Sequence, residues 1–202
     1  MKTRDPGFSR DDSIAAVRHT GLNRELQETL IDIIDVCSFF NQNLPNTTLD
    51  ITLFLETQTS ICYRLLCLHE LGSPWPTSES IEAAYHTALT LLMMTMFLQY
   101  DRRRVMDYNL ITRCLWYVLD DVSLDEDEDE LMLWVMVMGG IWIPGDDHMR
   151  LLAPRIRVTA QRLQLHTWDD MLDSVTKFPW IHAIHDEPGH KIWQRVMSET
   201  SE

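Results

Sequence analysis

Apolar residues recur every three or four positions over most of this chain, which is the pattern of helices that bury one face. The first such stripe predicts a helix over Leu22–Phe40, and the polar segment 41–46, which contains a proline, ends it. A second helix is predicted over about Thr48–Leu71, before the loop 72–76. The stripe that we expect to face the core on this second helix consists of Ile51, Phe54, Leu55, Cys62, Leu65, Leu66 and Leu68.

Two later segments are apolar on nearly all sides, which is typical of helices in the middle of a bundle. The helix predicted over Glu79–Gln99 loses its polar face after Ala88, and Leu131–Ile141 carries almost no polar residue. We expect the pair Gly139-Gly140 to end the second of these helices.

The other helices are predicted from weaker periodicity. They cover residues 104–119, residues 146–165 with a kink at Pro154, and two shorter segments that begin at Trp168 and near Gly189. Because Pro188 and Gly189 stand together, we expect a turn at this point, before the last helix.

The chain as a whole is predicted to be all-α. No strand-like alternation of useful length appears, and only 7 Gly and 8 Pro are present. We expect a single helical domain of about seven to eight helices over residues 21–202, with an acidic loop at 120–130 and a flexible N-terminal arm at 1–20. The acidic run Asp125–Glu130 is either solvated or the start of the next helix, where it would suit the helix dipole. With 11 Met and 7 Trp in the chain, the core should be rich in both residue types.

The charge of the chain narrows the partners that it can bind. It carries 17 Lys and Arg against 31 Asp and Glu, which gives a formal net charge of −14. Proteins that bind duplex DNA neutralise its phosphates with Lys and Arg, so we expect no unaided binding to nucleic acid or to an anionic membrane. The longest apolar runs are also shorter than the roughly 20 residues needed to span a bilayer.

The cysteines and the N-terminal sequence indicate the compartment. All four cysteines lie within apolar segments and none forms a C-x-x-C pair, which is typical of buried free thiols in a reducing compartment. No leader of basic, apolar and small residues opens the sequence. We therefore expect an intracellular protein, in the cytoplasm or the nucleus.

No pattern in the sequence predicts a cofactor or a metal site. Asp120-Asp121 lacks the third carboxylate of the Asp-Asp-x-x-Asp motif of terpene cyclases, and there is no P-loop, dinucleotide-binding or nucleophile-elbow motif. His182, His185 and His190 could supply imidazole ligands, but no His-Glu-x-x-His pattern or Cys pair accompanies them. We interpret these histidines as solvated or singly hydrogen-bonded.

Aromatic residues are spread over five of the predicted helices, and such helices converge only at a core. Plain packing is the simpler interpretation of this distribution. The alternative is a cavity, because a buried Trp or Tyr needs a polar partner, and a few polar points in an apolar hollow are typical of a small-molecule site.

The last part of the chain resembles the regulatory, or middle-homology, domain of fungal-specific transcription factors. The resemblance covers roughly residues 85–197 and depends on Leu133-Trp134, Gly139-Gly140-Ile141, Trp168-Asp169-Asp170, Phe178-Pro179-Trp180 and Ile192-Trp193 in this order. It implies an all-helical domain that senses small molecules or binds partners. In that family a separate cluster of six cysteines holds zinc and reads DNA, and this chain has no such cluster.

The resemblance and the missing zinc cluster favour a stand-alone regulatory module that binds an apolar small molecule or a protein partner, and not DNA. A structural remnant of a transcription factor without a ligand is a third option. The residues that we expect to line a ligand site, together with Tyr85, are Met93, Trp116, Trp134, Met138, Trp142 and Trp168.

The alternative function is a cofactor-independent cyclase or isomerase, of the pericyclase (Diels–Alder) type, acting on a terpenoid or polyketide in a fungal natural-product pathway. Such a reaction needs mainly shape and one or two hydrogen-bond donors. The candidate donors are Tyr85, His86, Tyr108 and Tyr117. An enclosed apolar cavity with a buried Tyr or His would favour the enzyme, and a filled core with an exposed apolar groove would favour a partner.

Overall fold

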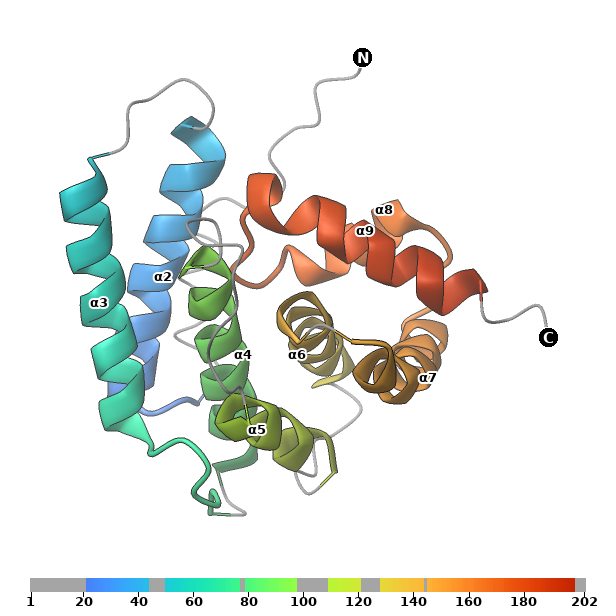
Figure 1. Cartoon of the computed structure of the whole chain (residues 1–202), viewed down its shortest axis with the longest axis horizontal. Helices are drawn as coiled ribbons and strands as arrows, with labels where there is room; N and C mark the ends of the chain where they lie inside the picture. The colour runs from blue at the N-terminus through green and yellow to red at the C-terminus, as the bar shows by residue number, and fades with distance from the viewer. Residues whose placement is uncertain are drawn as a thin grey trace.

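The computed structural model describes residues 21–43, 50–76, 79–97, 109–120, 128–143 and 145–198. Within these ranges the chain forms eight helices and no strand, which confirms the prediction of an all-α fold (Figure 1). The helices are α2 (Arg24–Asn43), α3 (Ile51–Leu68), α4 (Ser80–Phe97), α5 (Asn109–Asp120), α6 (Asp129–Trp142), α7 (Asp146–Arg162), α8 (Trp168–Val175) and α9 (His182–Ser198). The predicted arm at 1–20, Tyr108 and most of the acidic loop lie outside the described residues.

Helices α4 and α6 form the centre of the molecule. Figure 1 shows α2 and α3 side by side against one flank of α4, and α7, α8 and α9 grouped around α6. Both central helices are buried on nearly all sides, as their apolar sequences predicted. The buried apolar side chains of all eight helices belong to one continuous core, which contains six methionines and four tryptophans.

Helix α3 buries a different face from the one that we predicted. Its buried residues are Phe54, Gln58, Ile61 and Leu65, whereas Ile51, Leu55 and Leu66 of the predicted stripe are exposed. The helix carries apolar residues on more than one face, so periodicity alone did not select the face that packs against α2 and α4. The consequence is a helix that presents large apolar side chains to solvent.

The glycine pair does not end α6, contrary to the prediction. The helix continues through Gly139 and Gly140 to Trp142. A Cβ atom on Gly139 would lie 2.6 Å from Cδ2 of Leu115 in α5, and one on Gly140 would lie 2.9 Å from Cδ1 of Ile192 in α9. The two glycines therefore allow neighbouring helices to pack closely on α6, which is a tertiary requirement and not a helix stop.

The turn predicted at Pro188 and Gly189 is also wrong, because α9 begins at His182 and continues through both residues. Gly189 is buried, and a Cβ atom there would lie 3.0 Å from the ring of Trp168 and 3.2 Å from that of Trp180. Packing of these two indoles against the glycine stabilises a helix that the local sequence disfavours.

The described helices have two further properties that bear on the predictions. None of them combines the length and apolar character that crossing a membrane requires. All four cysteines are free, but only Cys37 is fully buried, and Cys67 is exposed, so the prediction of four buried thiols was wrong for Cys67.

Candidate functional site

Four of the predicted ligand-lining residues lie in the core. Met93, Trp134, Met138 and Trp142 are each at most 3 % exposed. The indole of Trp134 stacks on Phe178 with ring centroids 5.1 Å apart, and its N–H has no acceptor among the described residues. These side chains act as packing in the part of the chain that the structure describes.

Trp116 and Trp168 lie apart from that group, each half-buried with a histidine partner. Trp116 stacks on His148 of α7 at 6.2 Å, and Arg155 sits over the same indole at 5.5 Å. Trp168 stacks on His190 of α9 at 5.1 Å. The predicted lining residues are thus distributed over separate contacts and do not share one of the hollows described below.

Of the predicted hydrogen-bond donors, two are engaged with backbone carbonyls. His86 is buried, its Nε2 lies 2.8 Å from the carbonyl oxygen of Leu65, and desolvation lowers its pKa, so the ring is neutral. The hydroxyl of Tyr117 donates to the carbonyl oxygen of Trp75 at 3.0 Å. Both contacts tie α3 and the loop after it to α4 and α5.

Tyr85 is the third described donor and points to a different neighbourhood. Its ring centroid lies 6.3 Å from that of Trp134 and 6.2 Å from that of Phe178. Burial raises the pKa of its hydroxyl well above the ordinary value. His86 and Tyr117 both contact Trp75, the first with ring centroids 5.4 Å apart and the second through its hydroxyl, whereas Tyr85 lies at a different part of the core.

The three C-terminal histidines do not act as a group. His182 is exposed beside Asp186, with Nδ1 3.1 Å from a carboxylate oxygen, and His190 is exposed on Trp168. His185 is fully buried and makes two hydrogen bonds, so the prediction of solvated or singly bonded rings was wrong for this residue. No group of three His, Cys, Asp or Glu side chains among the described residues could hold a metal ion.

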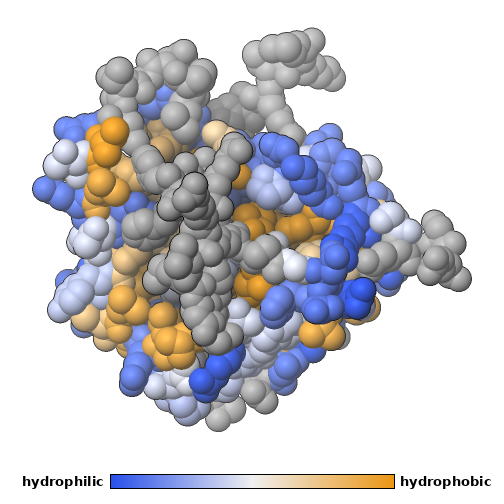
Figure 2. Space-filling view, viewed as in Figure 1, coloured by the Kyte–Doolittle hydropathy of each residue, from blue (hydrophilic) through white to orange (hydrophobic). Residues whose placement is uncertain are grey.

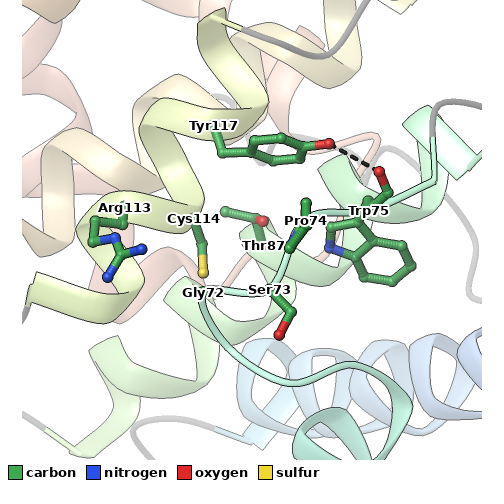
Figure 3. Close-up of a pocket in the computed structure, with 8 residues that line it drawn as sticks. All are labelled: Gly72, Ser73, Pro74, Trp75, Thr87, Arg113, Cys114 and Tyr117. Atoms are coloured by element: carbon green, nitrogen blue, oxygen red, sulfur yellow. Dashed lines mark hydrogen bonds between the residues drawn. The ribbon is translucent and has the colours of Figure 1, made fainter.

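A small hollow lies between the α3–α4 loop and α5 (Figure 3). Its volume is about 150 Å³. Thr87 of α4 and three residues of α5 form one side of it, and the loop forms the other; the lining residues are Gly72, Ser73, Pro74, Trp75, Thr87, Arg113, Cys114 and Tyr117. Figure 3 shows the sulfur of Cys114 and the hydroxyl of Thr87 directed toward the loop. Only Tyr117 among the predicted site residues lines it.

A larger groove of about 400 Å³ lies between α2 and α3. Its apolar lining consists of Val36, Phe39 and Phe40 from α2 and Leu53 and Phe54 from α3, and Asp35, Asp50 and Thr57 complete it. The rings of Phe40 and Phe54 meet edge to face at 5.4 Å and form a rigid base.

The groove belongs to a wider apolar surface. Figure 2 shows apolar side chains gathered on the side of the molecule that α3 forms in Figure 1. The large apolar residues that are exposed on α2 and α3 are Phe39, Ile51, Leu53, Leu55, Tyr63 and Leu66. The hydrophobic pattern did not reveal this surface, because it predicted most of the apolar residues of α3 to be in the core. The available signal was that α3 carries more apolar residues than one buried face can hold.

Comparisons with family models, curated proteins and solved structures find no match for this chain. The resemblance to the fungal regulatory domain therefore stays a prediction from the sequence.

Proposed function

We propose that this chain is a helical module of the regulatory type, which binds a partner protein and not DNA. In this proposal the partner inserts an amphipathic helix, apolar on one face and basic on the other, into the groove between α2 and α3. The observation that carries the proposal is the open apolar groove on a molecule whose predicted ligand-lining residues are packed in its core. The resemblance to regulatory domains supports the same class of function.

The exposure of the groove residues supports a macromolecular occupant. Phe39 is 46 % exposed and Leu53 is 61 % exposed, so each would still gain about half of the roughly 1.5–3 kcal/mol that full burial of a fully exposed apolar side chain provides. Large apolar side chains that are gathered on one surface, and not scattered singly, mark interaction sites. A groove between two helices is the form of site that accepts the apolar face of a third helix.

The charge of the groove lining supports a basic occupant. The charged residues that line it, Asp35 and Asp50, are both acidic. Asp50 accepts hydrogen bonds from the backbone of Thr52 and Leu53, so its carboxylate is fixed at the end of the groove. With a net charge of −14 on the chain, a helix that carries Lys or Arg beside its apolar face would be attracted from solution.

The cyclase or isomerase alternative has no supporting observation among the described residues. Tyr85 lies apart from the other two described donors, and His86 and Tyr117, which both contact Trp75, are engaged with backbone carbonyls. The enzymatic function therefore stays a hypothesis from the sequence.

The proposal is tested with a fluorescent peptide of 18 residues, built from Leu on one helical face and Lys on the other, titrated with the purified chain. We expect saturable binding, followed by fluorescence anisotropy. The double substitution Phe39→Ser and Leu53→Ser should weaken it about tenfold or more, because two anchors lose their apolar contact. Leu151→Ser is the matched control: Leu151 is 58 % exposed on α7, outside the groove, and its substitution should leave the affinity unchanged.

Two results would overturn the proposal. Equal affinities of the control and the double variant would show that the peptide does not use the groove. Binding of the neutral dye Nile red to the groove without any binding of the peptide would assign it to a small molecule. A second peptide with Glu in place of Lys should bind more weakly, and added salt should reduce that difference. Equal binding of the two peptides at low salt would contradict the basic character of the partner.

A further inference from the structure

The hollow of Figure 3 is a separate site from the α2–α3 groove, and it has its own chemistry. We propose that it binds a small organic acid, with a flat apolar body against Pro74 and Tyr117 and a carboxylate beside Arg113. This proposal does not depend on the proposed function, because the two cavities have no lining residue in common.

The wall that the loop contributes is fixed by contacts within the chain. The ring of His69 stacks on that of Trp75 at 3.9 Å, and its Nε2 lies 3.0 Å from the carbonyl oxygen of Ser73. The hydroxyl of Tyr117 holds the carbonyl of Trp75 from the other side. Gly72 supplies the left-handed backbone conformation that the loop needs, with φ of 88°. A hollow with such walls is preformed, so binding of a ligand costs little conformational entropy of the protein.

The size of the hollow sets the size of the ligand. At about 150 Å³ it matches an engineered apolar cavity in another protein that takes up a benzene molecule. A single ring or a short branched chain fills such a volume. The rings of Pro74 and Tyr117 supply flat apolar walls for that body.

The polar groups of the hollow favour an anion over a cation. Arg113 lines it, and no ion pair joins this guanidinium to an acid among the described residues. By contrast, Arg64, Arg155 and Arg162 each pair with a carboxylate. A guanidinium matches a carboxylate with two parallel hydrogen bonds, which is the strongest polar recognition that this site offers.

The other polar groups do not oppose an anion. Burial raises the pKa of the Cys114 thiol, which keeps the sulfur uncharged near neutral pH. The acid nearest to this edge in the chain is Glu70, which accepts a hydrogen bond from the hydroxyl of Ser73 at 3.3 Å, is exposed, and does not line the hollow. The hydroxyl of Thr87 is directed toward the loop side of the hollow and completes the polar edge (Figure 3).

Cys114 makes the proposal measurable, because its sulfur lines the hollow. The probe is benzoate, and the readout is the rate at which iodoacetamide alkylates each cysteine of the intact chain, followed by peptide mass spectrometry. We expect benzoate to slow the alkylation of Cys114 in a saturable way. Cys67 is exposed and outside the hollow, so its alkylation rate should not change, which provides an internal control.

The specificity for an acid is tested by removing the charge of Arg113 from the protein and, separately, the charge of the carboxylate from the probe. Arg113→Gln should raise the benzoate concentration that gives half-protection about tenfold or more, whereas Arg150→Gln, which removes an exposed arginine of α7, should not change it. The neutral isostere benzamide should protect wild-type Cys114 at least tenfold less well than benzoate. The proposal is overturned if millimolar benzoate leaves the alkylation rate of Cys114 unchanged, or if it slows the alkylation of Cys67 equally. It is also overturned if benzoate protects the Arg113→Gln variant as well as it protects the wild type and benzamide protects the wild type as well as benzoate does.

Discussion

At the scale of single residues, buried polar side chains connect helices that are distant in sequence. His185 of α9 is the clearest case. Its Nδ1 accepts a hydrogen bond from the backbone N–H of Ile181 at 3.0 Å, so the ring proton must be on Nε2. Nε2 then donates to the hydroxyl of Thr95 at 2.8 Å, and Thr95 donates to the carbonyl of Leu92 in α4. This chain of donors requires a neutral imidazole.

The neutral imidazole of His185 makes stability depend on pH. Burial is the main cause that lowers its pKa from 6.5 to about 3, against a smaller opposing effect of Asp186. Between these two values the unfolded chain binds a proton that the folded chain does not, so stability falls as the pH falls. The slope from this residue is up to about 1.4 kcal/mol per pH unit.

We expect urea unfolding of the wild type to show a lower free energy of unfolding at pH 5 than at pH 7. His185→Gln should be less stable at pH 7, because it loses buried hydrogen bonds, but its free energy should change less between the two pH values. His190→Gln is the control, since His190 is exposed and is not among the groups that shift the pKa of His185, and it should keep the wild-type dependence. A His185→Gln variant with an unchanged dependence would show that this ring is not the group responsible.

At the scale of the elements, contacts between helices are decided by a few small residues. Gly139 lets α5 approach α6, and Leu115 fills the space that a side chain would take. Gly140 lets α9 approach the same helix, but its nearest neighbours are the tips of Ile192 and Met149, which can move. The two glycines therefore differ in how strictly they are required.

Substitution of the two glycines by alanine should separate these roles. Gly139→Ala should lower the free energy of unfolding by about 1 kcal/mol, because overpacking costs about 1–3 kcal/mol and alanine returns up to about 1 kcal/mol of helix propensity. Gly140→Ala should be close to neutral. Urea unfolding at neutral pH measures both.

Leu115→Val provides the matched test of the Gly139 contact, since a shorter side chain makes room for the new methyl group. The double variant should lose less stability than the sum of the two single variants. If the two losses of stability simply add in the double variant, the side chain of Leu115 does not restrict the size of the residue at position 139.

At the scale of the whole molecule, the candidate binding features lie at the periphery of a packed centre. Helices α4 and α6 hold the predicted residues Met93, Trp134 and Met138 within the core. The groove lies on the outer pair α2 and α3, and the hollow lies where the next loop meets α5 (Figure 1, Figure 3).

The overall charge predicts how the chain behaves toward nucleic acid. With a net charge of −14, association with a polyanion must overcome repulsion at every distance within the Debye length. We expect no retardation of a random duplex DNA in a gel-shift assay at micromolar protein and physiological salt. Retardation that weakens steeply with salt would contradict this and would require a basic surface.

The hydrophobic pattern by itself determined that this chain is helical and where most helices lie. A period near 3.6 is a local property, so α2 and α7 were predicted close to their observed positions. The absence of a polar face on α4 and α6 was enough to place both helices at the centre, because such a helix is stable only when surrounded.

Only the tertiary structure decided which apolar faces are buried and which stay exposed. Helix α3 has apolar residues on two faces, and packing against α2 and α4 selected Phe54, Ile61 and Leu65 for the core, which left Leu53 in an open groove. Whether Gly139 ends a helix or admits a neighbour depends on Leu115, which is 24 positions away in the chain (139 − 115). These choices depend on contacts between residues far apart in sequence, and such contacts leave no period in the sequence for a local pattern to reveal.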